Sequence, residues 1–338
     1  MKITIPDISK QIYKEDVLDC LSQEYASLGP TWTSSQMQWV NGIYSAFKDH
    51  EKFLIIIYLI KKTLDFYSRN FIKLNYNETY AKDKIEVEKF NVIEISKVLK
   101  IPKESARRKI IELEKKGVIQ RNSKSIIIDR AAFPYVKPIN SVIRTSRFLS
   151  KFSNILAKEK VLKHGFKSTE LQEKIEQNFS YVWKLYYELQ IPMVIGWKGH
   201  FRDLCTWHIW GLCAANQINN ISKINENDSL DDFYKEFFSK ENGDNRPNGL
   251  NAMSISEITG IPRATVVRKL NSLLKSKHLV IDGNKRYLPS SFYQKEMSGV
   301  HYETIKNLSK FSTSIYNLSI VEDETTNKIE IPFYLKPL

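Results

Sequence analysis

The apolar residues between positions 254 and 275 predict two short helices joined by a tight turn. In the first, which we expect to begin near Ser254, Ile255 and Ile258 lie three apart and share one face. Gly260 then interrupts the pattern where a tight turn would need it. Pro262 suits the first turn of the second helix, because that position needs no amide donor. The apolar residues of this second helix recur at spacings of four and three: Val266, Leu270 and Leu273. The pattern is typical of a helix-turn-helix.

After Leu279 the pattern changes from that of a helix to that of strands. The segment "HLVIDGNKRYL" has two extended runs around Asp282 and Gly283, and Asp-Gly is a strong hairpin signal. A helix-turn-helix followed by a basic hairpin makes a winged helix. We therefore expect a mainly α-helical protein with small β wings.

The same pattern occurs 160 residues earlier. Residues 91–119 align with residues 251–279 without a gap, and nine of the 29 positions are identical. The identical pairs are Asn91/Asn251, Ile95/Ile255, Ser96/Ser256, Ile101/Ile261, Pro102/Pro262, Arg108/Arg268, Lys109/Lys269, Leu113/Leu273 and Lys115/Lys275. We interpret this as an internal duplication. It predicts tandem winged helix-turn-helix domains, at about residues 90–130 and 250–290, in a pseudo-two-fold duplicated chain with halves 1–164 and 165–338.

Further helices are predicted around each winged helix. The pentapeptide "LSKFS" occurs after both, from Leu149 and from Leu308, so its Leu and Phe are expected on one buried helical face, in a helix reaching about residue 164 in the first half. If these two helices pack together, the chain is a covalent pseudo-dimer. Upstream, residues 47–60 match residues 201–218 more faintly. The acidic residues 225–248 are expected to form a surface excursion, mobile in part.

The net charge of +13 is unevenly placed. Residues 91–130 hold eleven Lys and Arg against five Asp and Glu, and residues 251–290 hold seven against two. These stretches carry +11 of the +13, so the rest of the chain is nearly neutral. Charge concentrated in the duplicated unit indicates that a polyanion, double-stranded DNA, binds there.

The candidate DNA contacts lie opposite the apolar stripe and on the wings. Arg268, Asn271 and Lys275 point away from the stripe at 100° per residue. Arg263 and Thr265 occupy the first turn, the end that usually enters a major groove. The matched residues of the first copy are Lys103, Ser105, Arg108 and Lys115. Arg107 of the same helix is a further candidate, and the wings add Arg121, Lys124, Lys285 and Arg286. Arg and Asn side chains can read guanine and adenine, and Lys or Thr can hold phosphates.

The two copies differ in ways that bear on recognition. Ile111 replaces Asn271, so we do not expect them to read the same bases. Gly117 suits the end of the first recognition helix, whereas Lys277 holds the matched position, so this cap is not expected to be shared. We therefore expect an asymmetric DNA site whose half-sites lie about one turn, ~34 Å, apart.

At these residues the chain resembles a known superfamily. The segment "ISEITGIPRATVVRKLNSLLKSKHLV" is similar to the winged helix-turn-helix of bacterial transcription regulators of the MarR and IclR type. The resemblance covers about 40 residues in each half. It implies a dimeric or pseudo-dimeric DNA-binding regulator, and by position it implies that Arg263, Thr265 and Arg268 contact DNA. The glycine that usually precedes the wing is absent from the second copy.

Composition and the remaining motifs restrict which other classes of protein the chain can belong to. The longest apolar run, "FLIIIYLI" (residues 53–60), is too short to span a bilayer and favours a buried helix. The N-terminal residues lack the apolar core of a signal peptide, so we expect a cytoplasmic, nucleoid-associated protein. Three cysteines are too few for a disulfide framework. Motifs for a nucleophile elbow, a zinc protease or a phosphate loop are lacking, so we expect no enzyme, no cofactor and no metal.

Four tryptophans gather in 28 residues: Trp183, Trp197, Trp207 and Trp210. They have two interpretations, a pocket for a small aromatic or apolar effector and a rich core, and the prevalence of aromatic residues in cores favours the second. Cys205 and His208 share a helical face, but a metal site needs three or four ligands.

Other functions stay open beside transcription regulation. Tandem winged helices also occur in plasmid replication initiators, which bind repeated origin sequences, and an architectural nucleoid protein would bind DNA with weak sequence preference. An adaptor would use its winged helices to dock proteins. Further association of two chains is also open.

Overall fold

The computed structural model describes residues 8–122, 125–133, 137–221, 229–237, 249–290 and 294–326. Over these residues the protein is mainly helical with a few short strands, which confirms the expected class. None of the described helices has the length and apolarity needed to cross a membrane.

The helices follow one another in the same order in both halves of the chain. Those of the first half are α1 (Lys14–Gln23), α2 (Tyr25–Phe47), α3 (His50–Arg69), α4 (Tyr76–Thr79), α5 (Val92–Leu99), α6 (Lys103–Lys115) and α7 (Ile139–Lys158), with short 3-10 helices at Ile8–Lys10 and Arg130–Ala132. Those of the second half are α8 (Ser168–Gln177), α9 (Phe179–Phe201), α10 (Leu204–Ile221), α11 (Leu230–Phe237), α12 (Ala252–Thr259), α13 (Arg263–Lys275) and α14 (Gln294–Thr326). The counterparts α1 and α8 each have 10 residues, and α2 and α9 each have 23.

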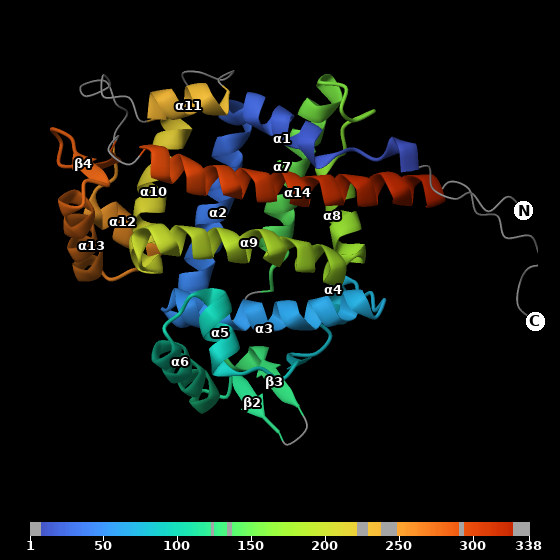
Figure 1. Ribbon diagram of the computed structural model, residues 1–338, viewed down its shortest axis with the longest axis horizontal. Helices are drawn as coiled ribbons and strands as arrows, with labels where there is room; N and C mark the ends of the chain where they lie inside the picture. The colour runs from blue at the N-terminus through green and yellow to red at the C-terminus, as the bar shows by residue number, and fades with distance from the viewer. Residues whose placement is uncertain are drawn as a thin grey trace, which may run out of the picture.

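The long helices form two crossed layers (Figure 1). In one layer α9 lies between α3 and α14, and in the other α2 lies between α10 and α7. Each layer therefore contains one outer helix from the other half of the chain. The smaller helices repeat this exchange, because α1 packs on α14 and α8 packs on α7. One hydrophobic core joins all of these helices.

The repeated pentapeptide lies on α7 and α14. Its Leu and Phe are buried in both copies: Leu149, Phe152, Leu308 and Phe311. This confirms the buried face predicted from the sequence. The two helices also touch, since the hydroxyl of Tyr316 on α14 donates to the carbonyl of Leu149 on α7 over 2.7 Å. Part of the shared core is therefore a direct contact between the two helices that carry the motif.

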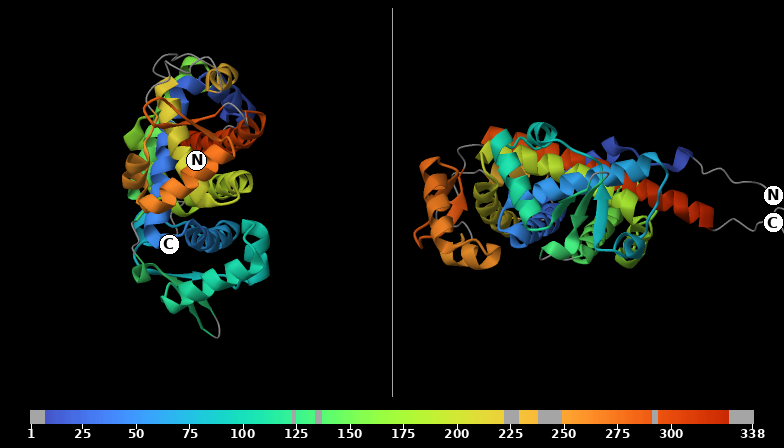
Figure 2. Two further views of the ribbon diagram at one scale, coloured as in Figure 1. Left: turned by 90° about the vertical axis from the view of Figure 1, so that its left-hand side faces the viewer. Right: turned by 90° about the horizontal axis from the view of Figure 1, so that it is seen from below.

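A small unit projects from each layer. The first basic unit (residues 84–129) contains α5, α6 and an antiparallel sheet of β1 (Lys84–Val87), β3 (Ile126–Asp129) and β2 (Ile119–Arg121), in that order. The second basic unit (residues 249–290) contains α12, α13 and the hairpin of β4 (Leu279–Ile281) and β5 (Tyr287–Pro289). A single bridge from Leu250 to Tyr287 supplements this hairpin. The units pack on α3 and on α10, at neighbouring edges of the molecule (Figures 1 and 2).

The same local bonds set the turn between the two helices of each unit. A serine of the first helix donates to a carbonyl beyond the turn over 2.7 Å, from Ser96 to Ile101 and from Ser256 to Ile261. The pattern of buried and exposed residues is identical over the first twenty aligned positions. Val266, Leu270 and Leu273 are fully or almost fully buried, which confirms the predicted stripe.

The predicted face of the first short helix was wrong at one position. Ile255 is buried, but Ile258 is 47% exposed. The second buried residue of this helix is Thr259, whose hydroxyl donates to the carbonyl of Ile255 over 2.6 Å and accepts from the N–H of Ile261 over 3.2 Å. A hydroxyl with both partners can be buried, so a polar residue occupies the inward position. The helix also begins at Ala252, before the expected start.

The caps of α6 and α13 are shared, contrary to the prediction. Gly117 follows α6 at a φ of +72°, and Lys277 adopts the same left-handed conformation after α13 at +59°. In both units the next residue donates its N–H to the carbonyl five residues back, over 3.0 and 2.8 Å. The surrounding structure therefore imposes on a lysine the conformation that glycine adopts freely.

The acidic stretch 225–248 differs from the expected excursion at its centre. There α11 buries Leu230, Phe233 and Phe237 and packs against α2 and α10. A spacing of three and four residues places these side chains on one inward face. Residues 222–228 and 238–248 lie outside the described residues.

Lys277→Gly is expected to stabilise the protein by about 0.5–1 kcal/mol, because glycine relieves the left-handed strain. The matched change Gly117→Ala is expected to destabilise it by about 1 kcal/mol, since alanine introduces the same strain. Urea unfolding followed by circular dichroism measures both midpoints. A lower midpoint for Lys277→Gly would contradict the assignment of strain to this cap.

Candidate nucleic-acid interface

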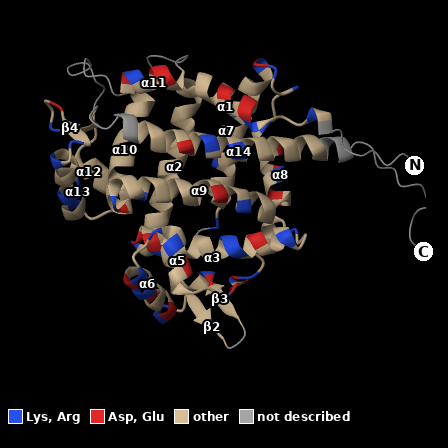
Figure 3. Ribbon diagram, in the orientation of Figure 1, with Lys and Arg blue, Asp and Glu red and all other residues tan. Residues whose placement is uncertain are grey.

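α13 presents an outward face with positive charge only (Figure 3). The helix contains no Asp or Glu. Arg263, Arg268, Asn271 and Lys275 are exposed, and Thr265 is half-buried. Among the described residues, no carboxylate forms an ion pair with the exposed cations of this helix. The predicted residues of α13 therefore share one accessible surface.

α6 presents the matched face with mixed charge. Lys103, Arg107, Arg108 and Lys115 are exposed, and Ser105 is half-buried. The helix also carries three glutamates, and Arg108 lies 3.9 Å from one of them, Glu112. The first unit therefore offers a weaker field to an anion than the second.

The two hairpins that follow α6 and α13 place their basic residues differently. Arg121 pairs with Glu114 of α6, and its guanidinium lies 4.9 Å from the ring centre of Phe90, so it is held within the first unit. Lys124 lies outside the described residues.

The strands β4 and β5 form the predicted hairpin, in which Leu279 pairs with Pro289. Its turn is closed by the carboxylate of Asp282, which accepts two backbone N–H groups over 2.9 and 2.8 Å. The left-handed residue is Lys285 at a φ of +57°, not Gly283. Lys285 is exposed and Arg286 is half-buried.

Two matched lysines that were not predicted as site residues tie the units to the layers. Lys109 of α6 pairs with Asp49 and lies 3.4 Å from Glu51. Lys269 of α13 lies 2.8 Å from Asp203. Both lysines are largely buried, and both aspartates stand directly before the long helix beneath, α3 or α10. The sequence contained a signal for this contact. Both copies have a lysine at this position, and both matching upstream segments, residues 47–60 and 201–218, contain an aspartate.

The charge of these aspartates depends on their lysines. Burial alone raises the pKa of Asp49, but the hydrogen bond and charge of Lys109, with two backbone N–H bonds, outweigh it and hold the pKa below 3.8. At Asp203 burial likewise raises the pKa, and Lys269 and Thr206 outweigh it. Both carboxylates are therefore ionised at neutral pH.

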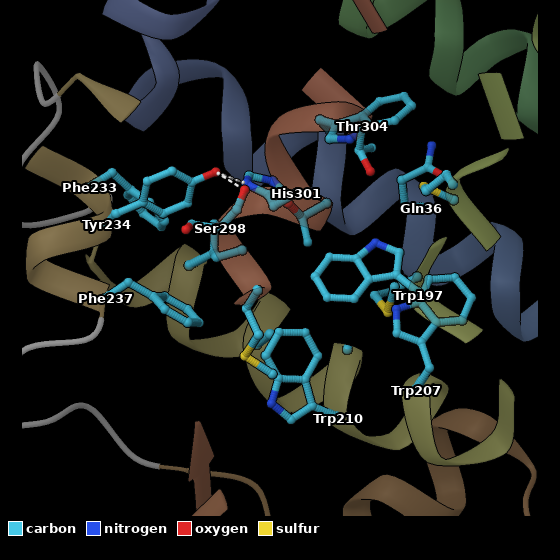
Figure 4. A pocket seen from close by; sticks show the side chains of 18 residues that line it. Gln36, Trp197, Trp207, Trp210, Phe233, Tyr234, Phe237, Ser298, His301 and Thr304 are labelled. Carbon is cyan, nitrogen blue, oxygen red and sulfur yellow. Dashed lines mark hydrogen bonds between the residues drawn. The ribbon is translucent and has the colours of Figure 1, made fainter. Parts of the chain in front are cut away.

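The tryptophans of the aromatic stretch are buried, as the core interpretation predicts. Three of them nevertheless line a cavity of about 80 Å³ beside α11: Trp197, Trp207 and Trp210 (Figure 4). The side-chain carbonyl of Gln36 and the indole N–H of Trp210 have no hydrogen-bond partner among the residues that the structure describes. Trp183 lines a different, larger cleft.

Cys205 and His208 do not face a common site. The Nδ1 of His208 lies 3.0 Å from the Nε2 of His50, and its Nε2 lies 2.6 Å from the Oδ1 of Asn41. Burial lowers the pKa of both imidazoles, that of His50 to about 4. The described residues contain no cluster of three or more His, Cys, Asp or Glu side chains that could hold a metal ion.

Asp49→Asn is expected to lower stability by about 1 kcal/mol at pH 7, because Lys109 loses a charged acceptor. The native pKa of Asp49 is lowered, so its contribution is present above the unfolded value of 3.8 and is lost as pH falls through the native one. The difference from the wild type should therefore shrink at pH 3 in urea unfolding. Asp19→Asn is the control, because Asp19 is exposed and forms no ion pair among the described residues. An equal deficit of Asp49→Asn at both pH values would contradict the charge pairing.

The exposed cations of α6 and α13 can hold an extended anion, because the neighbouring lysines are already paired with aspartates.

Comparison of the chain with family models, with curated proteins and with solved structures found no match.

Proposed function

We propose that the chain is a tandem winged-helix protein that binds double-stranded DNA and regulates transcription. The observation that carries this proposal is the pair of matched, outward basic faces on α6 and α13. In each unit, two helices joined by a tight turn are followed by a two-stranded hairpin, the element order of a winged helix. The first helix of such a pair supports the second, and the second enters the major groove.

The different roles of neighbouring lysine and arginine residues support DNA as the ligand. Lys109 and Lys269 are used inside to hold each unit on its layer, whereas the neighbouring Arg108 and Arg268 point outward. Exposed cations are available to phosphates and to guanine edges, and Arg268 has no ion-pair partner among the described residues. In each helix, two adjacent residues thus carry the two functions of the positive charge.

The two units are proposed to contribute unequally. α13 has four basic residues and no acidic one, whereas α6 has five basic and three acidic residues. The second unit should therefore bind the DNA backbone more strongly, and the first should add less affinity. Asn271 and Ile111 differ at matched exposed positions, which supports an asymmetric DNA site with non-identical half-sites.

A protein-docking adaptor is the second candidate, because both units also expose apolar residues. Ile93 and Val98 on α5, and Met253 and Ile258 on α12, are each about half exposed. They occupy matched positions, so the duplicated fold presents the same apolar face twice. Such a face suits a protein surface better than a phosphate backbone.

Arg268→Ala is expected to weaken binding to a selected duplex by about 10-fold or more, because one arginine contact to a base or phosphate is worth ~1–3 kcal/mol. Arg108→Ala should weaken it less, since Glu112 already offsets that charge. Affinity is measured by fluorescence anisotropy at several salt concentrations, on a 30-base-pair duplex enriched from a random library. The slope of log affinity against log salt should fall by about one unit for each lost phosphate contact.

Lys310→Ala, an exposed lysine in the middle of α14, is the control and should bind as the wild type does. Retained affinity in the double variant Arg108→Ala with Arg268→Ala would exclude the proposed interface. Salt-dependent binding without enrichment of any sequence would favour an architectural role. Absence of binding at moderate salt would favour the adaptor.

A further inference from the structure

A cleft of about 420 Å³ opens between α2, α7 and α9. Its walls come from the crossed layers, and none of the residues that line it belongs to either basic unit. The residues that define it are Trp39, Phe53, Ser141, Arg144, Trp183 and Tyr187. Its volume falls within the range of small-molecule sites in proteins, ~300–1,000 Å³.

Arg144 supplies a positive charge without an internal counter-ion. Its side chain is half-buried, and the hydroxyl of Ser141, 3.0 Å away, is an acceptor but carries no charge. Among the described residues no carboxylate pairs with it. Burial lowers the pKa of its guanidinium, yet an arginine remains charged in a protein. A half-buried cation in this state favours an anion as its partner.

The start of α7 reinforces that preference. Pro138, Asn140 and Ser141 in its first turn line the cleft, and the helix has no side-chain cap at its N-terminus. The 20-residue helix carries four basic residues and no acidic one. The amides of a helix N-terminus and its partial positive charge attract anions.

The other walls of the cleft are aromatic. Trp39, Trp183 and Tyr187 are all buried by more than nine tenths. The indole N–H of Trp183 has no hydrogen-bond partner in the described structure. Flat apolar walls favour a planar ligand.

The second half shows that the fold does not require such a cleft. The cavity beside α11 occupies the equivalent place, because Met193 and Trp207 stand 154 residues after Trp39 and Phe53. There Phe233 and Phe237 of α11 narrow the space to about 80 Å³ (Figure 4). The position matching Arg144 is Glu303, which is exposed and pairs with Lys306 over 2.7 Å. Only the first half combines the open cleft with the arginine.

We propose that this cleft binds a small planar aromatic anion, with its carboxylate or phosphate on Arg144 and the first turn of α7 and its ring between Trp39, Trp183 and Tyr187. The proposal stands independently of DNA binding, because no residue of the basic units takes part in it.

The test is isothermal calorimetry on the full chain without DNA, using indole-3-carboxylate and its neutral isostere indole-3-carboxamide as probes. The carboxylate is expected to bind about 10-fold or more tightly than the carboxamide, since a charge-assisted hydrogen bond is lost in the latter. Arg144→Gln should weaken carboxylate binding by about 10-fold or more and should leave carboxamide binding unchanged. Arg144→Lys should restore part of the loss.

Arg147→Gln is the matched control, because it removes the same charge three residues further along α7 from an exposed position outside the cleft. It should bind the carboxylate as the wild type does. Equal binding of the two probes, equal effects of the two arginine variants, or no carboxylate binding up to about 5 mM would each overturn the proposal. The thermal midpoint of each variant separates loss of the site from loss of the fold.

Discussion

The packing of α3 on α9, and of α10 on α2, sets the position of both basic units. Each unit rests on an outer helix that belongs to its own half of the chain but packs on the central helix of the other half. The helices that follow the two hairpins, α7 and α14, extend the exchange, because α1 packs on α14 and α8 packs on α7. Neither half has a core of its own, so the two units are held in one arrangement by a single shared core. A chain built in this way has the reciprocal contacts of an isologous dimer without needing a second copy.

In each unit, one basic residue attaches the unit to the layer beneath it and the next basic residue faces solvent. The inward lysine of the second helix meets an aspartate that stands before α3 or α10, and the outward arginine next to it faces solvent. A largely buried ion pair is directional, so it fixes the angle of the unit on its layer as well as its attachment. The outward charge is then presented on a rigid surface, which limits the entropy lost when an anion binds.

The local elements could be predicted from sequence because their signals are local. The stripe of Val266, the Asp282 hairpin and the buried face of "LSKFS" each follow from a spacing of a few residues. The exchanged packing could not, since α2 and α9 bury residues on most of their surface and lack a clear polar face. The left-handed Lys277 was missed for a related reason: the surrounding structure imposes that conformation against the residue's own preference. At the candidate interface, exposure of the basic residues followed from periodicity, but the pairing of Arg121 depended on tertiary contacts.

The two halves have diverged mainly where they meet solvent or enclose space. Burial is identical over twenty aligned positions of the two units, while the exposed residues beside them change in charge and shape. Glutamates appear on α6 but not on α13, and the pair Arg144 and Glu303 changes sign between equivalent helices. Close packing limits which side chains fit in the core, and it limits them in both halves because each half packs against the other. The differences in charge on the exposed faces, and in volume between the cavities, agree with the unequal binding proposed for the two halves of the chain.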